Sequence, residues 1–324
     1  MPFQDFIGQE QIIKLLKISL AENTLSHALL FTGPAGSGKE TLAFLLAQAV
    51  NCREENPPCG ECLSCRKTMS LNHPDVRLLT REGTGIRISQ IRALEQESLS
   101  QPYEGRKKVV IIRDAEDMSL AAANSFLKTL EEPPPYMIFV LLSGRPQALL
   151  PTIKSRCRIF PFQPVPEKLI TAYLVKKKAL LPAEARIFAA LSRGKVGLAV
   201  ALSEGEEFFA LRERAYSFIK GLRKLAKKEI FPLAEKLAQE EESALFLDLC
   251  LEILRDLFLY RETGKEDYVT NIDYLEFYQN DRYWQQQRIL GAISLLVKAK
   301  EDLGASVNPK LAFGAMLLEF KEVI

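Results

Sequence analysis

Apolar residues form short uninterrupted runs in the first half of the chain. Five such runs predict β-strands, at residues 26–33, 75–79, 108–112, 137–143 and 158–162. Segments with helical periodicity lie between them, at residues 40–50, 86–100 and 119–135. Strands that alternate with helices predict an α/β domain, in which helices cover both faces of a parallel sheet.

The pattern changes at residues 163–168, where the sequence QPVPEK contains two prolines. No further strand is expected beyond this point. Short helices are predicted up to residue 204, around a loop at 193–197, and long helices after it. We therefore expect three regions: an α/β domain (1–163), a small helical domain (164–205) and a helical carboxyl-terminal domain (206–324). The charged stretch at 224–229 is interpreted as a solvated helix face.

Composition and charge narrow the class of protein. The chain has 324 residues, of which 47% are hydrophobic and 26% charged, as in ordinary globular proteins. A formal net charge of +2 gives no overall basic bias of the kind that nucleic-acid binders show. The amino terminus lacks the pattern of a secretory signal, and no apolar run is long enough to span a membrane. A cytoplasmic protein is expected.

The sequence GPAGSGKETL (33–42) nearly matches a phosphate-binding loop, G-x-x-x-x-G-K-[ST]. It follows a predicted strand and opens a predicted helix, which is the context that the motif requires. Gly33, Gly36, Gly38 and Lys39 keep the backbone cradle and the cation. Glu40, however, occupies the position of the hydroxyl that coordinates magnesium, and Thr41 lies one residue too late. We expect a loop of this conformation without tight, catalytic binding of ATP.

A second departure follows the strand at 108–112. Phosphate-loop ATPases place an aspartate at the end of another strand, where it helps to hold magnesium. Here the next residues are Arg113, Asp114, Ala115 and Glu116. An arginine stands where the acid is expected, although Asp114 could serve if the register shifted by one residue. The simpler interpretation is that these acids cap the turn after the strand.

Four of the six cysteines, Cys52, Cys59, Cys62 and Cys65, lie within a short segment after the first helix of the α/β domain. Clustered thiols in a reducing compartment are more often metal ligands than disulfides. Four thiolates suit a structural, tetrahedral Zn²⁺, which would supply folding energy to a segment with almost no core. Unpaired thiols and an iron–sulfur cluster are the alternatives. His73 is interpreted as a turn or packing residue.

Several motifs together resemble one known family. They are the phosphate loop, the cysteine insertion after its helix, AAANSFLKTLEEPPP (121–135) and LLPTIKSRC (149–157). In these the chain resembles the bacterial clamp-loader ATPases (AAA+) of DNA polymerase III, clearly over residues 1–204 and less specifically beyond. The resemblance implies a P-loop α/β domain, a helical lid domain and an all-α collar domain that takes part in oligomerisation.

The resemblance also implies roles for individual residues. Arg156 matches the family's arginine finger, which reaches the ATP of a neighbouring subunit and stabilises charge in the transition state. Ser143 matches the family's first sensor residue. Gly197 stands where motor subunits carry an arginine that senses their own nucleotide. With Glu40 and Arg113, this is a third departure from a subunit that hydrolyses ATP.

The family context leads to a functional hypothesis. The chain is expected to be a non-catalytic component of the DNA polymerase III holoenzyme, in a hetero-oligomer that loads the sliding clamp on primed DNA. The expected partners are gamma/tau-like motor subunits and a delta-like subunit, with indirect contact to the clamp and DNA. One alternative is an active gamma/tau-like motor subunit. Another is a zinc-dependent DNA-binding protein with a vestigial nucleotide fold, against which the near-neutral charge argues.

Overall fold

The computed structural model describes residues 2–83, 85–205, 207–239, 242–305 and 307–323. The chain divides into two compact units, the first formed by Met1–Tyr173 with Arg193–Leu198 and the second by Leu174–Ser192 with Ala199–Ile324. The division into three regions at 163 and 205 stays a prediction. Residues 1, 206 and 324, which bound the predicted regions, lie outside the described residues.

The first unit is built on one parallel sheet, and all five predicted strands are confirmed. They are β1 (Ala28–Thr32), β2 (Val76–Leu79), β3 (Lys108–Ile112), β4 (Met137–Ser143) and β5 (Arg158–Pro161). Their order is β2-β3-β4-β1-β5, and every neighbouring pair is parallel. The central strand β4 and its neighbour β1 are buried along their whole length, as continuous apolar runs in parallel sheets usually are.

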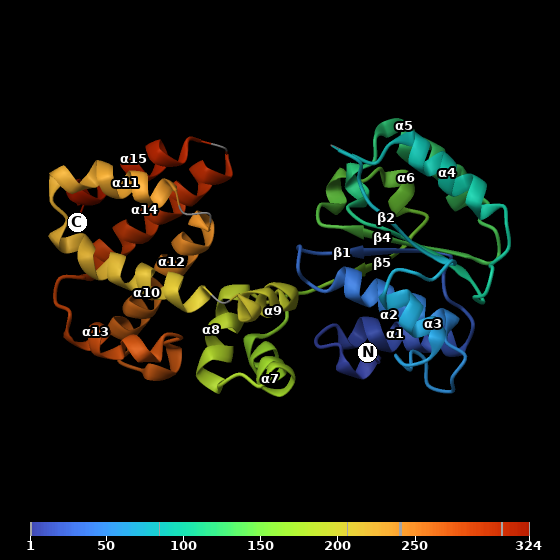
Figure 1. Ribbon diagram of the computed structural model, residues 1–324, viewed down its shortest axis with the longest axis horizontal. Coiled ribbons are helices and arrows are strands. Elements are labelled where there is room, and N and C mark those ends of the chain that lie inside the picture. Colours follow the sequence, from blue (N-terminus) through green and yellow to red (C-terminus); the bar gives the residue numbers. More distant parts are fainter. Residues whose placement is uncertain (1, 84, 206, 240–241, 306, 324) are drawn as a thin grey trace. The chain divides into compact units, whose positions relative to one another are not determined.

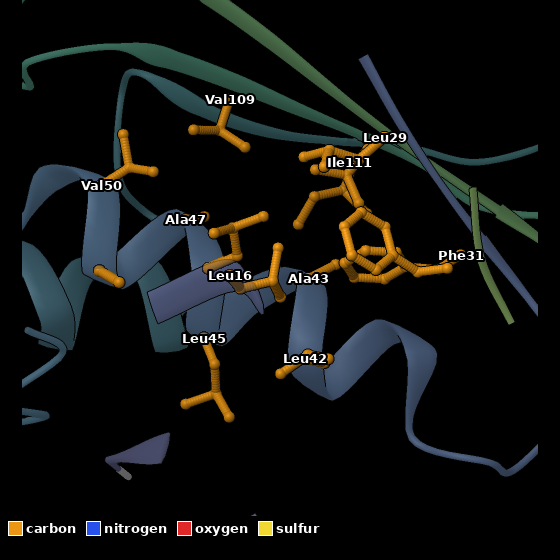
Figure 2. Close-up of a cluster of buried hydrophobic side chains, with 14 of the residues drawn as sticks. Leu16, Leu29, Phe31, Leu42, Ala43, Leu45, Ala47, Val50, Val109 and Ile111 are labelled. Carbon is orange, nitrogen blue, oxygen red and sulfur yellow. The ribbon is translucent and has the colours of Figure 1, made fainter. Parts of the chain in front are cut away.

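Side chains of successive strand residues point to opposite faces of the sheet, so that the sheet has a hydrophobic core on each side. Leu29 and Phe31 pack on one face, against α1 (Glu10–Ala21) and α2 (Lys39–Asn51) (Figure 2). Ala28 and Leu30 pack on the other face. That face is covered by α4 (Ile88–Ser98), α5 (Leu120–Glu131) and α6 (Pro151–Lys154) (Figure 1). The α/β class predicted from the sequence is confirmed.

Helix boundaries in the first unit follow capping rules. The Ser119 hydroxyl accepts a hydrogen bond from the backbone N–H of Ala122 at 3.2 Å and so caps α5, as predicted. The helix ends before the three prolines at 133–135. Helix α4 begins at Ile88 and ends at Ser98, within the predicted range of 86–100. Three helices of this unit were not predicted: α1, α3 (Leu63–Met69) inside the cysteine segment, and the short α6.

The second unit is helical, and no strand occurs after β5 in the described part of the chain, as predicted. Its helices are α8 (Pro182–Ser192), α10 (Phe208–Gly221), α11 (Ile230–Ala238), α12 (Ser243–Thr263), α13 (Leu275–Asn280), α14 (Gln286–Gly304) and α15 (Pro309–Val323). Two further helices, α7 (Glu167–Lys178) and α9 (Val196–Glu204), cross the division between the units. Among the helices that the structure describes, none combines the length and apolar character of a membrane span.

Short 3-10 helices connect these elements. They are η1 (Phe3–Asp5), η2 (Ala115–Asp117), η3 (Pro146–Ala148), η4 (Leu222–Lys224), η5 (Lys227–Glu229), η6 (Glu266–Tyr268) and η7 (Ile272–Tyr274). The predicted loop at 193–197 is shorter than expected, because α9 already begins at Val196.

Candidate functional site

The glycine-rich loop connects the carboxyl end of β1 to the start of α2, at the edge of the sheet where parallel α/β folds bind ligands. Gly33 and Gly38 have positive φ angles of 142° and 89°. A Cβ atom on Gly33 would lie 2.8 Å from the carbonyl oxygen of Phe162. Only glycine fits this backbone, and the structure therefore has a loop of the predicted kind.

Lys39, the cation of this loop, is engaged by the loop itself. Its ammonium group donates hydrogen bonds to the carbonyl oxygens of Gly33 at 2.6 Å and Pro34 at 2.8 Å. Burial lowers the pKa of Lys39, although the nearby carboxylates of Glu116 and Asp114 act in the opposite direction. The group that would neutralise phosphate oxygens is thus turned back onto the chain.

Glu40 and Arg113, the two residues that depart from the ATPase pattern, bind each other. The guanidinium of Arg113 donates two hydrogen bonds of 2.6 Å, one to each carboxylate oxygen of Glu40. Hydrogen bonding to Glu40 is the main cause of the raised pKa of Arg113. Glu40 also lies in the first turn of α2, where the helix dipole favours a negative charge. Inspection of the sequence found both departures but not their pairing.

The other sequence-predicted residues of this site lie nearby with different surroundings. Thr41 is exposed on α2. Ser143 is fully buried at the end of β4, where its carbonyl accepts a hydrogen bond of 3.1 Å from the N–H of Gly33. Its hydroxyl has no hydrogen-bond partner among the described residues. Ser143 is therefore placed directly behind the phosphate loop.

Glu116 has a structural role that the sequence suggested only in general terms. One of its carboxylate oxygens accepts hydrogen bonds from the backbone N–H groups of Gly144 at 2.9 Å and Arg145 at 3.0 Å. Its side chain thus holds the turn that follows β4, in agreement with the interpretation that these acids cap turns. Asp114 adopts a left-handed backbone conformation, with a φ of 49°.

The start of α9 lies against the loop. The N–H of Gly197 donates a hydrogen bond of 3.2 Å to the carbonyl of Gly36. A Cβ atom on Gly36 would lie 3.3 Å from the Cβ of Lys195. Gly197 thus occupies the loop surface at the position where the family resemblance placed an arginine in motor subunits.

Arg156 lies near the amino ends of the strands, whereas the phosphate loop lies at their carboxyl ends. It precedes β5, whose first residue, Arg158, pairs with Leu29 near the start of β1, whereas the loop follows the end of that strand. At about 3.3 Å per strand residue, the two positions are roughly 15–20 Å apart along the strands. Arg156 pairs with Glu131 at 2.5 Å and donates to the carbonyl of Thr152 at 3.0 Å. It therefore cannot act on a nucleotide bound at its own loop.

The four clustered cysteines come together as a candidate metal centre. All four sulfur atoms lie within 4.8 Å of one another. The Sγ atoms of Cys59 and Cys65 are 3.9 Å apart, and those of Cys52 and Cys62 are 4.0 Å apart. Tetrahedral coordination with Zn–S bonds of about 2.3 Å requires separations of about 3.8 Å. The arrangement is compatible with zinc.

Backbone groups support this centre. The Sγ of Cys59 accepts hydrogen bonds from the N–H groups of Cys62 at 3.3 Å and Glu61 at 3.4 Å. These bonds lower the pKa of Cys59 to about 7 and so favour the thiolate that a metal requires. The buried carbonyl of Cys65 accepts a hydrogen bond from the side chain of Gln48 on α2. The segment is thereby fixed to the core of the first unit.

The remaining candidates lie outside the cysteine cluster. His73 is buried, and its ring contacts the Ser64 hydroxyl at 3.1 Å and accepts a hydrogen bond from the N–H of Asp75. This is the packing role interpreted from the sequence. Cys250 is fully buried on α12 and Cys157 is half-buried before β5, and burial raises the pKa of both thiols.

Comparison with known proteins identifies the family. The family model described as DNA polymerase III, delta subunit, matches residues 8–166. The delta' subunit of DNA polymerase III from Bacillus subtilis is 34% identical, over 97% of this chain and 96% of that protein. The delta' subunit from Pseudomonas aeruginosa is 36% identical, over 74% of this chain and 75% of that protein. The tau subunit from Bacillus subtilis is 28% identical, and the match spans 96% of this chain but only 60% of tau. The chain therefore belongs to the family of DNA polymerase III delta' subunits.

Proposed function

We propose that this chain is a clamp-loader subunit that does not hydrolyse ATP itself. The observation that carries this proposal is the bidentate pair between Glu40 and Arg113. In a working site a hydroxyl and an acidic side chain would hold magnesium at these two positions. Here each charge is neutralised by the other, so that neither residue is available to bind magnesium or to orient a water molecule.

The conformation of the loop supports the same proposal. Lys39 is hydrogen-bonded to carbonyl groups of its own loop, and the Gly36 carbonyl is bonded to Gly197. For Lys39 to reach a bound phosphate, its two hydrogen bonds to the loop would have to break. The P-loop residues Gly33, Gly36, Gly38 and Lys39 then serve as a scaffold. Nucleotide binding is expected to be weak.

We further propose that Arg156 completes the ATPase site of an adjacent motor subunit. Its position far from its own loop agrees with action on another chain, and about a third of its side chain is exposed (34%). The pair with Glu131 holds the guanidinium at the surface until a stronger anion, such as a γ-phosphate, competes for it. Arginine fingers of this kind accelerate phosphoryl transfer by about 10³–10⁵-fold. Ser143 retains a sensor-like position without a nucleotide to sense.

The remaining predictions from the sequence belong to this proposal. The partners would be gamma/tau-like and delta-like subunits of a cytoplasmic complex, which acts on the sliding clamp and primed DNA. Residues 164–205 would correspond to the lid and residues 206–324 to a collar that assembles with the collars of neighbours.

The cysteine cluster is proposed to hold one structural Zn²⁺. All four coordination positions would be filled by Cys52, Cys59, Cys62 and Cys65, which leaves none for a substrate or water. The ion would contribute folding free energy to a segment whose own apolar core is small.

The test uses the complex assembled from this chain with motor-type and delta-type subunits. Arg156→Ala and Glu131→Ala both remove the same ion pair, but only the first removes the guanidinium. We expect Arg156→Ala to assemble normally and to lower turnover at the completed site by about 10³-fold or more, whereas Glu131→Ala retains activity. Equal losses in both variants would assign the pair a structural role. Hydrolysis by the isolated chain that depends on Lys39 would instead support the motor-subunit alternative.

A further inference from the structure

A groove in the second unit is formed by α10, α11 and the first turn of α12, together with η4 and η5. Figure 1 labels α10, α11 and α12. Its volume is about 510 Å³, within the range of about 300–1,000 Å³ that is usual for ligand pockets. The apolar lining residues are Phe218, Leu222, Leu225, Leu233, Leu237 and Phe246.

The floor and walls of this groove differ in burial. Phe246 is almost completely buried and packs edge-on against Phe218, with 5.4 Å between the ring centroids. Phe218, Leu225 and Leu233 are only half-buried, so that part of their apolar surface faces the groove. The groove therefore offers a fixed aromatic floor with apolar walls to which a bulky side chain could bind.

Basic residues surround this apolar surface. Between residues 214 and 236 the sequence has seven Lys and Arg but only two Glu, whereas the whole chain has a formal net charge of +2. Lys224 and Lys236 line the groove and are exposed. Within the residues that the structure describes, neither has an acidic side chain at ion-pair distance.

The one acidic residue of the lining does not neutralise this rim. The Glu229 carboxylate accepts a hydrogen bond of 2.8 Å from the N–H of Ala226 and so stabilises the turn before α11. The lysines of η5, Lys227 and Lys228, are also exposed. The charged residues at 224–229 are exposed, as the interpretation of a solvated face requires, but they lie in the 3-10 helices η4 and η5 at the edge of an apolar groove and not on a long helix.

We propose that this groove binds a short acidic, amphipathic segment of a partner protein. Bulky apolar side chains of the segment would enter the groove, and flanking carboxylates would pair with Lys224 and Lys236. Helix-in-groove recognition of this kind uses apolar anchors at positions i, i+3 and i+7, and the complementary charges would raise the association rate. The inference does not depend on the ATPase role proposed above.

Two other occupants fit the groove less well. Nucleic acid binds through its phosphates, which the rim could contact but the apolar floor could not. A second copy of the chain in a two-fold contact would bring the same basic rim against itself, and the like charges would repel. An acidic segment with apolar anchors can pack its apolar side chains on the floor and pair its carboxylates with the lysines of the rim.

The test measures fluorescence anisotropy of a labelled helical peptide with the full-length chain. The probe has about 14 residues, with Leu, Phe and Leu at i, i+3 and i+7 and Glu at its other exposed positions. Two comparison peptides replace the Glu residues by Lys, or the three anchors by Ala. The protein variants are Lys224→Glu with Lys236→Glu at the rim, and Leu233→Ser in the wall. Lys168→Glu with Lys176→Glu on α7 changes the net charge equally and serves as the matched control.

We expect saturable binding of the acidic peptide that weakens as salt is added. Affinity should fall about tenfold or more in the rim variant and in the wall variant, and less than about twofold in the control. The Lys and Ala peptides should bind weakly in all proteins. Absence of binding by the acidic peptide, or equal binding of all three peptides, would refute the proposal.

Two further measurements address the other occupants. If a DNA duplex binds more tightly than the acidic peptide, with loss in the rim variant but not in the wall variant, the surface recognises phosphate. If sedimentation shows self-association that Leu233→Ser abolishes, the groove is an interface between copies. Either result would overturn the proposal.

Discussion

Arg113 and Glu40 are separated by 73 residues in the sequence but are joined by two hydrogen bonds of 2.6 Å at the carboxyl edge of the sheet. Compared with a working ATPase, Glu40 stands in place of a hydroxyl residue and Arg113 stands in place of an acidic residue. Each replacement alone would leave an uncompensated charge beside the loop. Together they form a neutral, bidentate pair, which is the strongest geometry for arginine and a carboxylate.

The pair predicts how nucleotide binding could be restored. Glu40→Thr with Arg113→Asp returns both the hydroxyl and the acid, so we expect Mg-ATP to bind at least about tenfold more tightly than to the unchanged chain. Isothermal titration calorimetry measures the affinity. Lys39→Ala in the double variant should abolish the gain. If the unchanged chain already binds Mg-ATP as tightly as the double variant, the pair does not disable the site.

Either single replacement should behave differently from the double one. Glu40→Thr leaves Arg113 without its partner, and Arg113→Asp places a second acid beside Glu40. Because the pair is partly exposed, we expect losses of only about 1 kcal/mol in the free energy of unfolding, with no gain in nucleotide affinity. Chemical denaturation and calorimetry of the two single variants test this. A gain in Mg-ATP affinity from Glu40→Thr alone would show that Arg113 does not obstruct the site.

The chemistry of Arg156 predicts that charge alone is insufficient. Arg156→Lys keeps a positive charge but loses the planar fork that binds two oxygens at once. In the assembled complex we expect this variant to recover only a small part of the ATPase activity lost in Arg156→Ala. Full recovery with lysine would indicate a general electrostatic effect in place of a finger.

The cysteine cluster predicts one zinc ion for each chain, measurable by elemental analysis of the purified protein. Cys59→Ser or Cys62→Ser should lower the zinc content and the thermal stability of the first unit, because a structural site is linked to folding. Cys157→Ser, outside the cluster, should leave the zinc content unchanged. Full zinc content in the Cys59 and Cys62 variants, or iron in place of zinc, would contradict this assignment.

Elements set by local sequence were predictable in this protein. The five strands are uninterrupted apolar runs, and Ser119 with three later prolines marks both ends of α5. Helix α1 was missed, although Ile12, Ile13 and Leu16 bury one of its faces. The short spacing of the cysteines predicted their cluster because their separation along the chain limits the separation of their sulfur atoms.

Relationships between distant segments were not predictable in the same way. The pair of Glu40 with Arg113 depends on how the ends of β1 and β3 lie in the sheet, and local periodicity carries no information about that. The contact of Gly197 with Gly36 likewise joins segments that are far apart in sequence. The charges at 224–229 predicted a solvated face, but the groove beside them depends on how α10, α11 and α12 pack, which the sequence pattern does not show.

The hydrogen bonds of the Asp75 carboxylate should stabilise the folded first unit at neutral pH but not in acid. Its buried carboxylate accepts hydrogen bonds of 2.7–2.8 Å from the backbone N–H groups of Tyr103, Glu104 and Gly105. Burial alone would raise the pKa of Asp75, but these bonds outweigh it and hold the pKa below its ordinary value of 3.8. The stabilisation is therefore present above pH 3.8 and is lost as the pH falls through the lower, folded-state value.

Asp75→Asn tests this prediction. The amide places an N–H group against one of the backbone donors, so we expect a loss of about 2–4 kcal/mol in the unfolding free energy of the first unit at neutral pH. Far-UV circular dichroism in denaturant, repeated at lower pH, measures the effect. The difference from the unchanged chain should shrink as the pH falls. A difference that does not depend on pH would show that the charge of Asp75 contributes nothing.

Replacement of Asp256 by asparagine should have the opposite effect on stability from Asp75→Asn, because the surroundings of the two carboxylates differ. It is fully buried, and one oxygen, Oδ2, accepts all of its hydrogen bonds, from the N–H groups of Thr270 and Asn271 and from the Asn271 side chain. The other oxygen, Oδ1, has no hydrogen-bond partner among the described residues. Burial raises the pKa of Asp256 despite these bonds. Ionisation of Asp256 therefore destabilises the folded state. The free energy of unfolding is greatest below pH 3.8 and falls as the pH rises through the higher pKa that Asp256 has in the folded state.

Asp256→Asn keeps an oxygen for the three donors and removes the buried charge. Because the unpaired Oδ1 position can accommodate the amide nitrogen, we expect the unfolding free energy of the second unit at neutral pH to stay within about 1 kcal/mol of the unchanged chain or to rise. The single tryptophan, Trp284, is fully buried in this unit, so its fluorescence reports the transition. Asp256→Ala, which removes the acceptor as well, should cost about 1–3 kcal/mol for the donors left unpaired. A loss from asparagine as large as that from alanine would mean that the charge itself, and not the acceptor, holds the segment at 270–271.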